Sequence, residues 1–145
     1  MAVDAAQLLK MSPEELATLF RSSEAGEIPV GKAKGTVLFA PGTKIAWPIK
    51  QFARYLIWQG KVFNPDRGDL KNLILPFGLA AVRAKVYKDA SWFDEKETIV
   101  LDYSKTSFLA QKIRDEIREV SPGVYLGLVF WGRTLILHFT LTRTA

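Results

Sequence analysis

From Thr36 onward the chain consists of short apolar-rich runs, several of which alternate apolar and polar residues with the period of two typical of β-strands. The predicted strands cover residues 36–40, 58–64, 70–76, 81–88, 97–103, 113–120, 124–131 and 134–143. The runs are separated by turn-forming sequences such as Asn64-Pro65-Asp66-Arg67-Gly68, Ser121-Pro122-Gly123 and Gly132-Arg133. Eight tilted strands close into a barrel just wide enough for one small ligand. We therefore expect a mainly β fold, an eight-stranded antiparallel barrel with a few helices.

Two segments carry helical patterns. Ser12-Pro13-Glu14-Glu15 combines an N-cap hydroxyl, a proline at the first helical position and a glutamate at the third, which predicts a helix over residues 13–21. Pro48 fits the first turn of a second helix, with the apolar face Ile49, Phe52, Ala53 and Leu56. This second helix would cover one mouth of the barrel. Residues 26–35 contain Pro29, Gly31 and Gly35 and are predicted to form a loop.

Residues 105–120 support two interpretations. Leu109, Ile113, Ile117 and Val120 recur at helical spacing, so one continuous helix is an alternative. The favoured interpretation is a short helix to about Lys112, followed by a strand that pairs through the next turn. In either case 145 residues suit a single domain, with an N-terminal helical and loop segment over 1–35 and the barrel over 36–145.

Composition narrows the chemistry. The chain has no cysteine, which excludes disulfides, thiolate nucleophiles and sulfur-ligated metals. Its net charge is +5, and the stretch between Glu27 and Asp66 holds six basic residues and no acid. This block most simply forms a solvated face, although it could also meet an anionic ligand, a membrane or nucleic acid. Nucleic acid is not expected as a partner, because the basic residues are not interleaved with aromatics along one strand face. Trp47 and Lys50 suit transient membrane contact.

The N-terminal ten residues carry Asp4 and no long apolar run, so they are not predicted to be a signal peptide. The longest apolar runs, such as 124–131, fall far short of the roughly 20 residues that a spanning helix needs. A cytoplasmic location is the expectation.

Several segments of the predicted barrel follow one another in a familiar order. They are Trp58-Gln59-Gly60-Lys61-Val62-Phe63, then Arg83-Ala84-Lys85, then Leu101-Asp102-Tyr103, then Asp115 through Arg118-Glu119-Val120 to Tyr125-Leu126-Gly127. On these segments the chain resembles the small bacterial family of lipocalin-like (calycin) barrels named for a GXWXG motif, with Leu56 at the first glycine of that motif. The resemblance covers residues 58–131, about half of the chain. It implies a small, flat, apolar ligand, since calycins bind fatty acids, retinoids or haem, and a few catalyse cyclisations.

Aromatic and basic side chains on the strands are the candidates for ligand binding. Lys85 or Arg114 would meet a carboxylate or carbonyl group of the ligand. The aromatic candidates are Trp58, Tyr87, Tyr103, Tyr125 and Trp131. Gly60, two residues after Trp58, would let another backbone pass close by. Where both faces of a strand are apolar, parity does not decide which side chains point inward.

The candidates for catalysis are two acids, a tyrosine and the single histidine. Burial of Asp102 or Asp115 among apolar residues would raise its carboxyl pKa and suit it for acid–base chemistry, with Tyr103 or His138 as hydrogen-bond donor. The structural alternative is an ion pair inside the barrel or at its rim. His138 lies on the mixed face of strand 134–143, which either faces outward or lines a partly polar cavity. No metal site is expected, because no second His or any Cys could complete one.

The leading functional hypothesis is therefore binding of a small hydrophobic molecule, such as a lipid, terpenoid, steroid or polyketide-like compound, without a cofactor. The second is a cofactor-independent isomerase or cyclase that uses a buried aspartate. Asp102→Asn would distinguish the two, because an enzyme should lose turnover by roughly 10²–10⁴ while a binder keeps most of its affinity. Haem binding through His138 is a third hypothesis.

Overall fold

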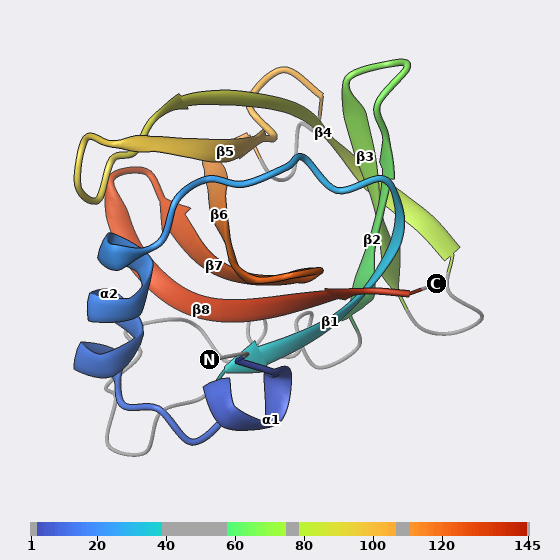
Figure 1. The fold of residues 1–145 in the computed structure, drawn as a ribbon. Coiled ribbons are helices and arrows are strands. Elements are labelled where there is room, and N and C mark those ends of the chain that lie inside the picture. Colours follow the sequence, from blue (N-terminus) through green and yellow to red (C-terminus); the bar gives the residue numbers. More distant parts are fainter. Residues whose placement is uncertain (1–2, 39–57, 75–78, 107–110, 145) are drawn as a thin grey trace.

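The computed structural model describes residues 3–38, 58–74, 79–106 and 111–144 (Figure 1). In this part of the chain, eight antiparallel strands follow one another in chain order around a closed barrel. The strands are β1 (Gly31–Leu38), β2 (Trp58–Asn64), β3 (Asp69–Ile74), β4 (Leu79–Ala90), β5 (Glu97–Asp102), β6 (Ile113–Ser121), β7 (Val124–Trp131) and β8 (Thr134–Arg143). The predicted eight-stranded barrel is confirmed.

The barrel closes through β1, which pairs with β2 on one side and with β8 on the other. This strand begins at Gly31, earlier than the predicted start at Thr36. The sequence of residues 31–35 is typical of a loop, but closure of the barrel gives this segment a hydrogen-bonded strand on each side. The carbonyl oxygen of Ala33 lies 2.1 Å from where a Cβ of Gly60 would be. The expectation that the missing side chain of Gly60 admits a neighbouring backbone is therefore confirmed.

The second half of residues 105–120 forms a strand, as the favoured interpretation predicts. Ile113–Ser121 forms β6, which pairs with β5 and β7, so one continuous helix is wrong. Here, pairing with a neighbouring strand on each side outweighs the local helix propensity. Residues 111–112 form a turn before β6, and the rest of the predicted short helix falls largely on residues 107–110, outside the described part. The predicted helix at Pro48, with Trp47 and Lys50, also lies outside it.

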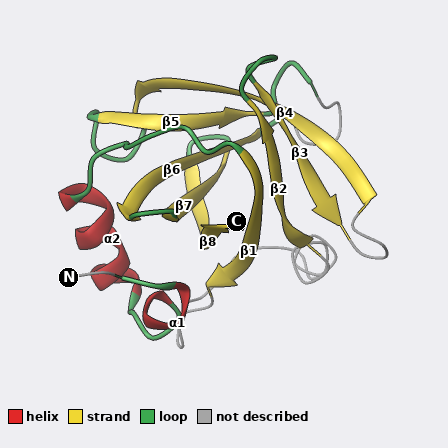
Figure 2. Cartoon of the chain, turned by 45° about the vertical axis from the view of Figure 1, so that its right-hand side comes forward, coloured by secondary structure: helices red, strands yellow, loops and turns green. Residues whose placement is uncertain are grey.

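Two N-terminal helices pack against the outside of the barrel (Figure 2). They are α1 (Ala5–Leu8) and α2 (Pro13–Ser22). The predicted start of α2 is confirmed, since Ser12 and Glu15 form a reciprocal capping box. Leu16 and Phe20 of α2 are buried in an apolar cluster with Leu126 and Leu128 on the outer face of β7. Neither described helix is long and apolar enough to cross a membrane.

A second apolar cluster lies inside the barrel, and every strand contributes side chains to it. On β8 the predicted apolar face largely points inward, as Leu137, Phe139 and Leu141 show. Leu135 instead packs in the outer cluster, because a register shift between Val129 and Phe130 changes the alternation there.

Gly127, on the inner face of β7, makes room for an aromatic ring of the facing strand. A Cβ at this position would lie 2.2–2.5 Å from three ring atoms of Phe139. We expect Gly127→Ala to lower the free energy of unfolding by about 1–3 kcal/mol, measured by urea denaturation, because the ring must leave its rotamer. Adding Phe139→Leu should recover part of the loss. An unchanged unfolding midpoint in Gly127→Ala would contradict this packing.

Candidate functional site

Four polar side chains meet inside the barrel and are together named the interior polar cluster: Lys61, Asn72, Tyr103 and Asp115. The Nζ atom of Lys61 donates to Asn72 Oδ1 and to the Tyr103 hydroxyl, each at 2.7 Å. It also lies 3.2 Å from Asp115 Oδ2. Asn72 Nδ2 donates to the Tyr103 hydroxyl at 2.9 Å, and that hydroxyl lies 3.4 Å from the Asp115 carboxylate. Each group therefore touches at least two of the others.

Strand register brings these four residues together. Lys61 on β2 lies directly opposite Asn72 on β3, so both point to the same side of the sheet. Asp115 on β6 lies opposite Leu101 of β5, whose side chain is inside the barrel. Tyr103 comes directly after β5, two residues after Leu101, and also joins the inner apolar cluster. Curvature of the closed sheet then turns the β2–β3 and β5–β6 pairs toward each other.

The cluster is removed from water. Lys61 and Tyr103 are each 3% exposed, Asp115 4% and Asn72 7%. Burial lowers the pKa of the Lys61 amine, although the Asp115 charge opposes that change. Burial likewise raises the pKa of the Asp115 carboxyl, against the effect of Lys61. The pKa of Tyr103 lies well above its usual value because of burial and the nearby Asp115 charge, so its phenol remains protonated.

One atom of the cluster lacks a partner. Asp115 Oδ1 is buried and receives no hydrogen bond from any residue in the described part of the chain. A buried carboxylate oxygen without a donor costs free energy, so this position suits a donor from a bound molecule. The cluster thus presents an acceptor, Asp115 Oδ1, beside a cation and a phenol hydroxyl.

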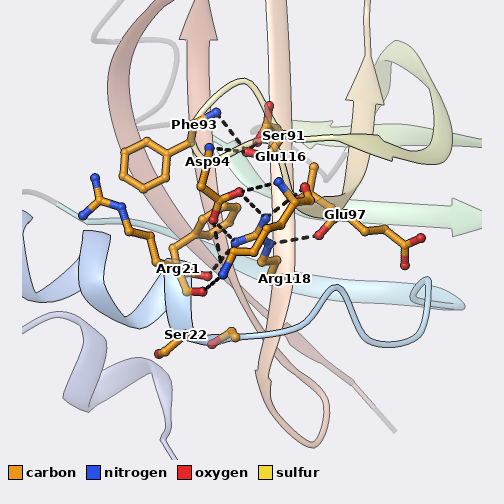
Figure 3. A network of polar contacts seen from close by, with 12 residues as sticks. Arg21, Ser22, Ser91, Phe93, Asp94, Glu97, Glu116 and Arg118 are labelled. Carbon is orange, nitrogen blue, oxygen red and sulfur yellow. Dashed lines mark hydrogen bonds and ion pairs between the residues drawn. The ribbon is translucent and has the colours of Figure 1, made fainter.

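The outer face of the barrel carries a second network of buried polar side chains, which includes Arg118 and Asp94 (Figure 3). Arg118 on β6 is fully buried and binds Asp94 through two nitrogen–oxygen contacts of 2.6 and 2.7 Å. Its guanidinium also donates to the carbonyl oxygens of Phe20 at 2.8 Å and Glu97 at 3.2 Å. These bonds join the end of α2 to the turn between β4 and β5, so the role of Arg118 is structural.

Glu116, a second buried charge on this face, is equally well bound. Its carboxylate accepts hydrogen bonds from Ser91 Oγ at 2.5 Å and from the Trp92 amide at 2.8 Å, and it pairs with Arg114 Nε at 3.1 Å. Arg114 also stacks on the ring of Trp92 at 4.2 Å. Neither Arg118 nor Glu116 has an unpartnered buried side-chain atom, in contrast to Asp115 of the interior cluster.

Of the predicted catalytic and ligand-binding residues, the structure brings two into the interior cluster, Tyr103 and Asp115. The other two members, Lys61 and Asn72, were not predicted. A signal for them exists in the strand pattern: Lys61 shares a face with Phe63, and Asn72 shares a face with Leu70. A lone polar residue on an apolar strand face either contacts a ligand inside the barrel or indicates that this face points outward. The sequence alone does not distinguish these two cases.

Four other predicted residues point away from the interior. Lys85 and Arg114 lie opposite Asp102 on adjacent strands, and all three side chains face outward. Tyr87 is also on the outer face, where its hydroxyl donates to Asp102 at 2.8 Å. Burial works to raise the pKa of Asp102, but hydrogen bonds from Ser104 and Tyr87 outweigh it and lower this pKa. Strand parity thus places these four side chains on the outer face, away from the interior polar cluster.

The remaining aromatic candidates are spread over the barrel. Tyr125 points inward, but its hydroxyl donates to the Glu27 carbonyl oxygen at 2.7 Å, on the segment before β1. Trp131 lies at the end of β7 and is partly exposed. The backbone of Trp58 begins β2, and its side chain lies outside the described part of the structure.

His138 lies on the outer face of β8, between Leu128 of β7 and Leu38 of β1. Its Nε2 atom is buried without a hydrogen-bond partner among the described residues. Burial lowers the pKa of His138 below 6.5. As the pH falls, the imidazole is therefore protonated in the unfolded chain before it is protonated in the folded protein, which destabilises the folded protein. The resulting stability is present above pH 6.5 and is lost as the pH falls toward the folded-state pKa.

A pH series tests this account of the single histidine. Between about pH 7.5 and about pH 5.5, urea denaturation should show a larger loss of unfolding free energy for the wild-type protein than for His138→Leu. An equal loss in both proteins would show that His138 titrates normally in the folded state.

No protein-family model matches the chain, and no curated protein sequence matches it. A crystal structure of a protein from Thermomonospora curvata is similar, with a TM-score of 0.66 and 19% sequence identity. The match covers 94% of this chain and 90% of that chain. At this level of sequence identity, the similarity shows a shared fold alone.

Proposed function

We propose that the barrel binds a small, largely apolar molecule through one hydroxyl or carbonyl oxygen, which the interior polar cluster recognises. The observation that carries the proposal is the buried Lys61–Asp115 pair, with Asp115 Oδ1 left without a donor. A ligand hydroxyl would donate to that oxygen. A ligand carbonyl would instead accept from Lys61 or Tyr103. The apolar remainder of the ligand would contact the inward side chains around the cluster.

Energetics support a functional role for the cluster. Replacing a buried ion pair by apolar residues of similar volume is often neutral or stabilising, so stability alone does not require Lys61 and Asp115 here. Unlike Arg118, this pair contacts neither of the two described helices.

An isomerase or cyclase without a cofactor is the second candidate, favoured by the raised pKa of Asp115 beside the Tyr103 hydroxyl. Asp115 would move a proton, and Tyr103 would hold a developing oxyanion. Asp115→Asn separates the two functions, because it keeps hydrogen-bonding atoms but not the acid–base group. A binder should keep most of its affinity, and an enzyme should lose turnover by roughly 10²–10⁴.

The binding proposal is tested with two ligands that differ only in a hydroxyl group, octane and octanol. Each displaces a neutral fluorescent probe, N-phenylnaphthylamine, from the protein. The wild-type protein should prefer octanol by roughly 10- to 100-fold, since a hydrogen bond to a charged group contributes about 1.5–3 kcal/mol. The double variant Lys61→Met/Asp115→Leu should lose this preference and keep octane binding. The proposal fails if neither ligand displaces the probe, or if both proteins show the same preference.

A further inference from the structure

The amine of Lys61 differs from every other described lysine in its surroundings. Lys61 is buried inside the barrel, whereas the other described lysines are exposed or, in the case of Lys71, partly exposed. Its Nζ lies over the rings of Tyr103 and Phe139, at 5.4 and 5.5 Å from their centroids. An amine held against apolar and aromatic surface is the setting in which lysines act as nucleophiles.

A base for this amine is already in place. Asp115 Oδ2 lies 3.2 Å from Nζ, within reach of direct proton transfer. Burial lowers the pKa of the amine and raises that of the carboxyl, so both changes favour passing the proton from nitrogen to oxygen. The transfer converts the ion pair into a neutral amine beside a neutral carboxylic acid.

A donor for the carbonyl oxygen is also present. The Tyr103 hydroxyl lies 2.7 Å from Nζ and is fixed by Asn72 Nδ2 at 2.9 Å. A carbonyl carbon in contact with Nζ would thus place its oxygen near a protonated phenol. Nucleophile, base and hydrogen-bond donor come from three different strand regions, yet lie within one set of contacts.

We propose that Lys61 forms a reversible imine with an apolar aldehyde or ketone held in the barrel. This inference rests on the proposed function and names carbonyl compounds as the ligand class. The proton of Nζ passes to Asp115, and the free amine attacks the carbonyl carbon, forming the C–N bond. A nitrogen proton moves to the oxygen, giving the carbinolamine. The C–O bond then breaks, water leaves with the proton from Asp115, and a protonated imine remains beside the Asp115 carboxylate.

Reductive trapping tests the inference with octanal as the probe. The wild-type protein is incubated with one equivalent of octanal and sodium cyanoborohydride, which reduces the imine to a stable secondary amine. Intact mass spectrometry should show one octyl group per chain, and peptide mapping should place it on Lys61. Labelling of Lys61 should exceed that of any exposed lysine by roughly tenfold.

Two variants serve as controls. Lys61→Met/Asp115→Leu removes the amine without leaving a buried charge unpaired and should abolish the site-specific label. Lys85→Arg removes an exposed lysine and should leave the label unchanged. Labelling spread over exposed lysines, or unchanged in the double variant, would overturn the inference.

Displacement of N-phenylnaphthylamine, measured on the same samples, separates the two proposals. If octanol and octanal displace the probe and Lys61 is not labelled, the imine inference is wrong and the binding function stands. If neither compound displaces the probe and Lys61 is not labelled, both proposals are wrong. Displacement together with a label confined to Lys61 supports both.

Discussion

Replacing Asp115 with alanine should lower the free energy of unfolding by about 3–5 kcal/mol, because it leaves the buried Lys61 ammonium without its counter-ion. Lys61 is 3% exposed, so water does not replace the lost carboxylate. The Tyr103 hydroxyl and Asn72 remain as neighbours, but neither carries a charge. Urea denaturation at pH 7 measures the change. A loss below about 1 kcal/mol would mean that the ammonium reaches water or gives up its proton without difficulty.

Removing both charges should have the opposite consequence. The double variant Lys61→Met/Asp115→Leu should unfold at a urea concentration equal to or above that of the wild-type protein, since apolar residues of similar volume avoid the desolvation of two charges. A stable double variant that no longer distinguishes octanol from octane would separate the role of the pair in recognition from its role in folding. A double variant as unstable as Asp115→Ala would contradict this separation.

Arg118→Met should also cost about 3–5 kcal/mol, for a structural reason. The substitution removes the two guanidinium donors of Asp94 and one donor each from the Phe20 and Glu97 carbonyl oxygens. The matched control is Lys88→Met, which removes an exposed ion pair with Glu97 and should cost about 0–1 kcal/mol. Urea denaturation compares the two variants.

Ligand preference provides the second measurement on Arg118→Met. Arg118 contacts α2 and the turn between β4 and β5 on the outside of the barrel, so the folded variant should still prefer octanol over octane. Loss of that preference, with folding retained at low temperature, would show that the outer network shapes the interior site.

The barrel could be predicted from the sequence because strand pattern and turn chemistry agree along most of its length. The predicted strand over 58–64 has the same bounds in the structure, as do those over 124–131 and 134–143. Strand β1 was partly missed, because the pairing that makes Gly31–Gly35 extended comes from residues far away in the chain. The helical spacing in 105–120 was misleading for the same reason.

The site was less predictable. Asp102 and Asp115 look alike in the sequence, each an acid two positions after an apolar residue of the same strand face, yet one lies outside the barrel and the other inside. Lys61 sits in the basic block that most simply reads as a solvated face, and only closure of the barrel puts its amine beside Asp115. Which face of a strand becomes the interior depends on register around the whole ring, which no single strand encodes.

The carboxyl carbon resonance of Asp115 tests most directly whether the interior polar cluster holds the ligand. A titration with octanol, followed by carbon-detected NMR, should move this resonance along a saturation curve with the affinity found by probe displacement. The carboxyl resonances of Asp94 and Asp102, on the outer face, should stay in place. Saturation with octanol that leaves the Asp115 resonance unmoved would contradict the account.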